Sequence, residues 1–155
     1  MNKLTHIDEN GNTIMVDVSN KTPTFRVAKG TGIILMSDEA KKSIKEHQNK
    51  KGDVLTVAQV AGIMGAKKTS DLIPLSHNIV LSKVNVTFEE VEGGYRCNSE
   101  VKCEGQTGVE MEALTAVNVA LLTIYDMCKA IDKKMVMKDI HLVEKHGGKS
   151  GDFYF

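Results

Sequence analysis

The fold is decided by one apolar stretch, residues 105–130, which reads GQTGVEMEALTAVNVALLTIYDMCKA. Between Glu112 and Asp126 no residue is charged and none is Gly or Pro. Such a run is too long for a typical strand, and apolar residues on nearly all sides of a helix predict that the helix is buried. Thr107 stands three positions before Glu110, the spacing of a capping box, so we expect the helix to begin here.

Charged residues occur on this helix only at its ends. At 100° per residue, Glu112 and Asp126 lie about 40° apart on the helical wheel, and Lys129 lies about 60° beyond Asp126. One interpretation is a plain i,i+3 ion pair between Asp126 and Lys129, worth about 0.3 kcal/mol. The other is that the three ionisable groups project from one side of the helix as part of a reactive site.

Length, charge and cysteine usage set the class of protein. The chain has 155 residues, enough for one domain with a real core. Its 20 basic and 20 acidic residues balance, which argues against nucleic acid or an anionic membrane as a partner. Three cysteines without a CxxC motif fit a reducing cytosol, and we see neither a signal peptide nor an apolar run of membrane-spanning length. We therefore expect a single cytoplasmic domain, residues 1–155.

The first 66 residues predict two short strands and two helices. Residues 1–30 are polar and weakly patterned, so we expect an arm across the domain or a neighbouring subunit, with a short strand at 15–19. Residues 32–36 predict a buried strand. Helices are expected at about 37–47 and, capped by Asp53, at about 54–66. The second helix has an apolar face formed by Val57, Val60, Ala61 and Met64.

A hairpin and a last strand complete the pattern. Residues 83–88 and 95–103 alternate in polarity around Gly93-Gly94, and residues 135–143 alternate again. The order of elements predicts an α+β ferredoxin-like sandwich, a four-stranded antiparallel sheet with helices packed on one face. Cys97 and Cys103 share a strand face, as two metal ligands could, but the absence of a CxxC motif and of clustered His favours structural burial. The central helix is more apolar than one sheet face requires, so we expect a homo-oligomer.

Two further segments carry candidate chemistry. The connection at 67–78 is long enough to be a functional loop, although His77 within it is also explained by a bond to a backbone carbonyl. The tail, residues 144–155, is Gly-rich and basic, but Gly148-Lys149-Ser150 lacks the first glycine of a P-loop. It is either a flexible tail able to close its lysines over a phosphate or a frayed terminus.

The ionisable residues at loops and element ends indicate nucleotide chemistry. A desolvated lysine can act as an acid or a base, and lysines suit phosphates. The carboxylates of Glu110 and Glu112 suit the N–H edge of a purine- or pterin-like ring. We expect a phosphorylated heterocycle handled by acid–base chemistry without a metal cage. The other candidate residues are Lys51, Lys67, His77, Asp126, Lys129 and Lys145.

Several segments in order along the chain resemble one known family. They read MVDVS (15–19), KGDV (51–54), AGI (61–63), AK (66–67), DLIPLSH (71–77), TGVEMEALT (107–115), LTIYDMCKA (122–130) and GGKSGD (147–152). Together they resemble the MoaC family, the cyclic pyranopterin monophosphate synthases of molybdenum cofactor (molybdopterin) biosynthesis. One departure is Ser76, where the family often has Cys, which argues against an essential thiol at this position.

The resemblance implies a ferredoxin-like fold and a homohexamer, a trimer of dimers with active sites between subunits. It implies a lyase that acts after a radical-SAM GTP cyclase and converts 3',8-cyclo-7,8-dihydro-GTP into cyclic pyranopterin monophosphate and pyrophosphate. Asp126 matches the active-site aspartate, and Lys51 and Lys129 match the lysines held to act as acid and base. No dedicated metal site is implied, although Mg²⁺ can accompany the triphosphate. The matched substrate-binding positions are Leu75, Ser76, His77, Glu110, Met111, Glu112 and Lys67, with Lys145 and a neighbouring subunit's Arg26 on the triphosphate.

Two other classes of function fit the same topology. A ligand-sensing module would bind a purine nucleotide without turnover. An RNA-binding domain of the RRM type would need aromatic residues on its central strands, where only Phe88 and Tyr95 are available.

Overall fold

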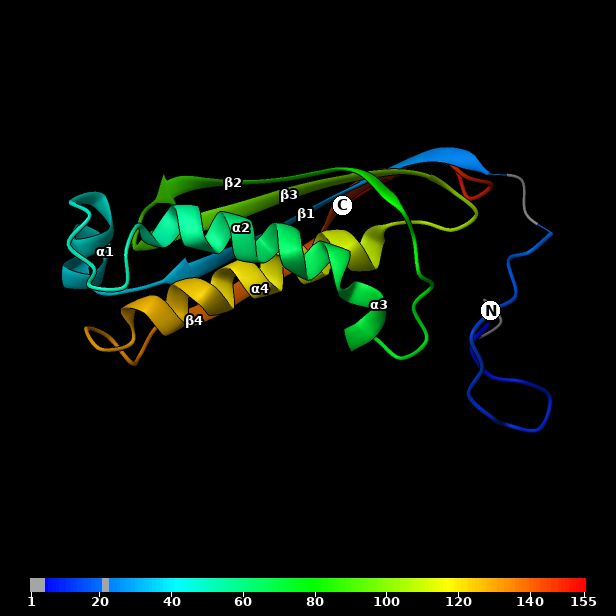
Figure 1. Ribbon diagram of the computed structural model, residues 1–155, viewed down its shortest axis with the longest axis horizontal. Helices are drawn as coiled ribbons and strands as arrows, with labels where there is room; N and C mark the ends of the chain where they lie inside the picture. The colour runs from blue at the N-terminus through cyan, green and yellow to red at the C-terminus, as the bar shows by residue number, and fades with distance from the viewer. Residues whose placement is uncertain (1–4, 21–22) are drawn as a thin grey trace.

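The computed structural model, which describes residues 5–20 and 23–155, contains one antiparallel sheet with helices on one face (Figure 1). The helices are α1 (Asp38–Lys45), α2 (Val54–Lys67), α3 (Thr69–Leu72) and α4 (Glu110–Cys128). The four long strands and the helices that cover them form the predicted ferredoxin-like sandwich, and β5 adds a short fifth strand at one edge. The strands, in the sheet order β2-β3-β1-β4-β5, are Leu81–Val91, Gly94–Gly105, Thr24–Leu35, Val136–His146 and Phe153–Tyr154.

Helix α4 is the core helix, as its sequence predicts. Ala113, Val117, Leu121 and Ile124 on it are fully buried. Among the described residues α4 alone has the length and hydropathy of a membrane-spanning helix, contrary to our expectation of none, but 56% of that window is buried inside the domain. The predicted capping box is wrong: the N-cap is Val109, which makes no side-chain capping bond.

Helix α2 lies against α4 through small residues (Figure 1). Ala58, Gly62 and Gly65 are buried, and a Cβ on Gly65 would lie only 2.8 Å from the side chain of Val119. The bulky apolar face predicted for this helix points outward instead, because close packing of two helices requires small side chains between them. Val57, Val60 and Met64 are 42%, 51% and 56% exposed.

Strand β1 begins within the segment that we expected to be an arm. Residues 24–30 pair with β3, and residues 27–30 also pair with β4, so backbone hydrogen bonds hold a segment with a weak apolar pattern. Residues 5–20 form the arm proper. The short strand expected at 15–19 is absent, and the carbonyl of Val16 instead bonds to His77.

The C-terminal segment is a hairpin rather than a free tail in this structure. Strand β4 continues to His146, and β5 returns to pair with Glu144 and Lys145. The turn needs glycine because φ is +93° at Gly147, where a Cβ would also collide with the carbonyl of Phe25. The hairpin therefore lies against the start of β1.

The cysteines are structural, as expected. Cys97, Cys103 and Cys128 are all buried and unpaired. Burial raises the pKa of the Cys97 thiol to about 12, so this group stays protonated and unreactive at neutral pH.

Candidate active site

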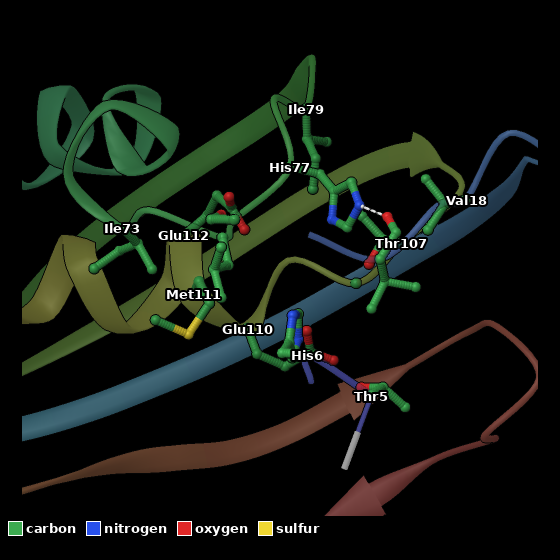
Figure 2. A pocket seen from close by; sticks show the side chains of 14 residues that line it. Thr5, His6, Val18, Ile73, His77, Ile79, Thr107, Glu110, Met111 and Glu112 are labelled. Atoms are coloured by element: carbon green, nitrogen blue, oxygen red, sulfur yellow. Dashed lines mark hydrogen bonds between the residues drawn. The ribbon is translucent and has the colours of Figure 1, made fainter. Parts of the chain in front are cut away.

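A cavity of about 560 Å³ lies at the N-terminal end of α4 (Figure 2). Three parts of the chain line it: the arm, the loop after α3, and the start of α4. The sequence-predicted residues that it brings together are Leu75, Ser76, His77, Glu110, Met111 and Glu112. A concave site with a few convergent polar groups is typical of a small-molecule pocket.

Glu112 is the buried acid of this pocket. Only 3% of it is exposed, and burial raises the pKa of its carboxyl group. The nearby Glu110 carboxylate raises that pKa further, whereas His77 lowers it. A raised pKa favours the protonated carboxyl group, which can donate as well as accept hydrogen bonds and so suits the amide edge of a heterocycle.

Glu110 connects the pocket to the sheet. Its Oε1 lies 2.7 Å from Nζ of Lys145 on β4, and both side chains are about one quarter exposed. Arg26 on β1 donates from Nε to the carbonyl of Gly105 at 3.1 Å. Its guanidinium lies beside Gly148, where a Cβ would collide with it. Lys145 therefore contacts a carboxylate that lines the pocket on the same chain, whereas Arg26 does not line the cavity.

His77 is held by the arm. Its Nε2 donates a short hydrogen bond to the carbonyl oxygen of Val16 (Figure 2). The alternative prediction, a histidine bonded to a backbone carbonyl, is therefore confirmed, but the ring also lines the pocket. Because Nε2 carries the proton of this bond, Nδ1 of the neutral ring is the acceptor.

A second cluster lies at the opposite end of α4. Asp126 accepts from two lysines, with Oδ1 2.9 Å from Nζ of Lys129 and Oδ2 3.2 Å from Nζ of Lys51. The i,i+3 ion pair predicted from sequence is confirmed. Hydrogen bonds from Lys129 and then Lys51 lower the pKa of Asp126, and the bond from Asp126 raises the pKa of Lys129. Lys129 is therefore a protonated amine at neutral pH.

The loop before α2 places Lys51 in this cluster. The backbone N–H of Lys51 donates to the side chain of Asn49 at 2.9 Å, and the Asn49 amide donates to the carbonyl of Met127. Asp53 caps α2 by accepting from the N–H of Thr56, as predicted. The loop is thereby tied to both helices.

The two clusters are far apart within one chain. Glu112 and Asp126 are separated by 14 residues of one helix, which is about 21 Å at 1.5 Å per residue. Figure 1 shows the loop before α2 and the end of α4 at one end of the molecule and the N-terminal arm at the other. The two carboxylates do lie on the same side of α4, as predicted, but they are too far apart along the helix to form one site. Lys67 is exposed at the end of α2 and does not line the cavity.

Sequence reasoning missed the arm as part of the pocket. The turn residues of Asp8 to Gly11 are a signal for a hairpin that we did not use. No pattern in the sequence indicates which pocket a polar arm would cover. The lining residues missed in this way are Thr5, His6, Val16 and Val18.

Comparison with protein families identifies the family of this chain. The model of the MoaC family matches residues 15–148. The chain belongs to the MoaC family. Within the residues that the structure describes, this MoaC protein has no group of three or more His, Cys, Asp or Glu side chains placed to hold a metal ion.

Relatives of this MoaC protein match it over nearly their whole length. The cyclic pyranopterin monophosphate synthase of Clostridium perfringens (strain SM101) is 54% identical over 156 residues, which cover 99% of each chain. The synthase of Novosphingobium aromaticivorans is 57% identical over 151 residues, 97% of this chain and 96% of the relative. That of Heliobacterium modesticaldum is 56% identical over 155 residues, 99% and 98% of the two chains.

Proposed function

We propose that this MoaC protein is a cyclic pyranopterin monophosphate synthase of molybdenum cofactor biosynthesis. Its reaction converts 3',8-cyclo-7,8-dihydro-GTP, supplied by a radical-SAM GTP cyclase, into cyclic pyranopterin monophosphate and pyrophosphate. The observation that carries the proposal is identity of 54–57% to synthases of this name over almost the whole chain. The pocket supports it, because its acids at Glu110 and Glu112 suit a heterocycle and Lys145, which contacts Glu110, suits a phosphate.

The catalytic site is completed by a second chain. Lys51, Asp126 and Lys129 lie about 21 Å along α4 from the pocket, which is too far for both clusters to touch one nucleotide ring system. A second copy that places its lysine cluster at the pocket of the first would join them. A homohexamer, arranged as a trimer of dimers, provides such contacts, and the exposed apolar face of α2 (Val57, Val60 and Met64) supports burial against another chain.

The reaction needs proton transfer and charge stabilisation. The bond to Asp126 stabilises the ammonium form of Lys129, which we assign the role of general acid. Lys51 bonds to the same carboxylate, and we assign it the role of general base. Closing the cyclic phosphate forms a bond from a sugar hydroxyl to the innermost phosphorus and breaks the bond to pyrophosphate. Arg26 and Lys145 suit the charge that develops there.

Two finer points belong to the same proposal. A magnesium ion would be held by the triphosphate with water, as is usual for nucleotides, and needs no protein cage. The protein acts in the cytoplasm, where GTP and the radical-SAM cyclase are available.

The test is a coupled assay. The cyclase generates the cyclised dihydro-GTP from GTP, and pyrophosphate and the pterin product are measured together. Equal amounts of both products support the synthase. Bound substrate that persists would overturn catalysis in favour of a nucleotide-sensing module. An RNA-binding role has no support, since Tyr95 is buried and Phe88 packs against the core, so neither ring is free to stack on a base.

A further inference from the structure

The N-terminal arm contains a compact hairpin. The N–H of Ile14 donates to the carbonyl of His6 at 2.8 Å, and Ile7 pairs with Thr13 in an antiparallel bridge. The carboxylate of Asp8 closes the turn by accepting from the N–H of Asn12 at 2.8 Å, while Gly11 adopts a φ of +81°. These bonds define the position of the hairpin's first residues without help from the His6 ring.

This hairpin is attached to the pocket. The carbonyl of Val16, two residues after the hairpin, accepts the bond from His77. Thr5 and His6 therefore line the same cavity as His77, Glu110 and Glu112 (Figure 2).

The orientation of the His6 ring is set by its own hairpin. Nδ1 lies 3.2 Å from the carbonyl oxygen of Ile14, and because a carbonyl only accepts, Nδ1 donates. The other nitrogen, Nε2, is then the acceptor of the neutral ring. His77 has the opposite tautomer in its neutral form, because its Nε2 donates to the backbone carbonyl and its Nδ1 is the acceptor. Both rings therefore line one pocket, and in the neutral form of each ring the carbonyl of the arm determines the tautomer.

We propose that His6 is a substrate-positioning residue, whose Nε2 accepts a hydrogen bond from an N–H or O–H group of the bound nucleotide's heterocycle or sugar. The inference rests on the proposed function and adds a residue to its site. A neutral acceptor suits the heterocycle or the sugar, whereas the phosphates suit cations such as Arg26 and Lys145. The pocket also offers the carboxyl groups of Glu110 and Glu112 and the ring of His77, so His6 adds a second imidazole acceptor.

A purely structural role predicts a different result from substitution. His6 is exposed, and its ring contributes one of several bonds that close the hairpin, so its removal should change folding stability little. The two amide side chains separate the two nitrogens of the ring. Asn places its amide near the position of Nδ1 and can restore the bond to Ile14, whereas Gln reaches the position of Nε2.

The experiment compares His6→Ala, His6→Gln and His6→Asn in the full chain, with the cyclised dihydro-GTP as substrate. His141→Ala is the matched control, because His141 makes the same kind of ring-to-carbonyl bond, to Asp139 at 2.8 Å, but does not line the pocket. The loss of one hydrogen bond should raise KM by roughly three- to tenfold in His6→Ala, with a smaller change in kcat. His6→Gln should recover most of that loss, and His6→Asn should not.

Either of two patterns would overturn the inference while leaving the proposed function in place. One is normal wild-type turnover with an unchanged KM in His6→Ala. The other is recovery by Asn and not by Gln, which would assign His6 to the hairpin alone. A wild-type chain that neither binds nor converts the nucleotide would instead overturn the proposed function, and this inference with it.

Discussion

Glu112 and Asp126 lie on the same side of one helix but belong to two different clusters. Glu112 is buried at the pocket, and Asp126 is exposed between Lys51 and Lys129 at the other end of α4. The rigid helix between them sets a separation of about 21 Å. Residues that the helical wheel assigns to one site therefore form two separate clusters, each of which supplies part of a site.

Replacing Lys51 by Ala should abolish turnover without unfolding the protein. The Lys51 side chain is half exposed, and its amine bonds to the Asp126 carboxylate and backbone carbonyl at the surface, so its removal should leave the core intact. Loss of an acid–base group typically lowers kcat by about 10²- to 10⁴-fold. Lys50→Ala is the control, since this exposed neighbour has no assigned role. Product formation by Lys51→Ala at the wild-type rate would remove Lys51 from the mechanism.

Asp126→Asn should move the alkaline limb of the pH–rate profile to lower pH. The Asp126 carboxylate raises the pKa of Lys129 by accepting its hydrogen bond, so a neutral amide lets the ammonium lose its proton more easily. The measurement is kcat/KM against pH. Asp71→Asn is the control, because Asp71 forms another i,i+3 pair, with Lys68 at 3.9 Å, outside both clusters. An unchanged limb in Asp126→Asn would mean that Lys129 does not act as the acid.

Glu112→Gln should make the protein relatively more stable as the pH rises. Burial raises the pKa of Glu112, so between its ordinary and raised pKa the folded state binds more protons than the unfolded state. Wild-type stability therefore falls as pH increases through that window, and Gln removes this loss. The measurement is Tm against pH, with the exposed Glu104→Gln as control. Parallel curves for wild type and Glu112→Gln would show that this carboxyl does not carry the pH dependence.

Gly65→Ala should destabilise the domain although Ala favours helices. Its Cβ would lie 2.8 Å from one carbon of the branched Val119 side chain and 2.9 Å from another, so α2 must move away from α4. Overpacking of this kind costs about 1–3 kcal/mol, against a gain in helix propensity of about 1 kcal/mol. Thr56→Ala on the exposed side of α2 is the control for propensity alone. Urea unfolding that gave a more stable Gly65→Ala would contradict the close packing.

The fold could be predicted where side-chain pattern and backbone agree. The uncharged run before Asp126 predicts a buried helix, and the alternation around Gly93 predicts the hairpin of β2 and β3. The start of β1 could not be predicted, because a central strand with neighbours on both sides is held by backbone bonds that leave no strong pattern. The outward face of α2 was mistaken for a core face, since the real contact uses Gly and Ala, which carry little apolar signal.

The sequence predicts which residues belong to the site but not where they lie relative to one another. Loop position and residue type indicated His77, Lys51 and Asp126, and resemblance to a family added Arg26. Their division between two ends of α4 follows from helix length, which the wheel angle alone does not show. His6 was missed because an exposed histidine in a polar arm has no periodicity to interpret.

The claim that two chains complete each site is tested most directly by mixing two inactive variants. Lys51→Ala removes one cluster and His77→Ala removes part of the other. The two are co-expressed with different tags, purified as the mixed population, and assayed for pyrophosphate and pterin product. A population in which both tags are Lys51→Ala is the control for co-expression itself.

If the sites are shared, a mixed pair keeps one of its two sites intact. A statistical mixture, half of whose pairs are mixed, should then regain about one quarter of wild-type turnover. If each site lies within one chain, every site carries a defect. A mixture no more active than the average of the two single variants would contradict the shared site.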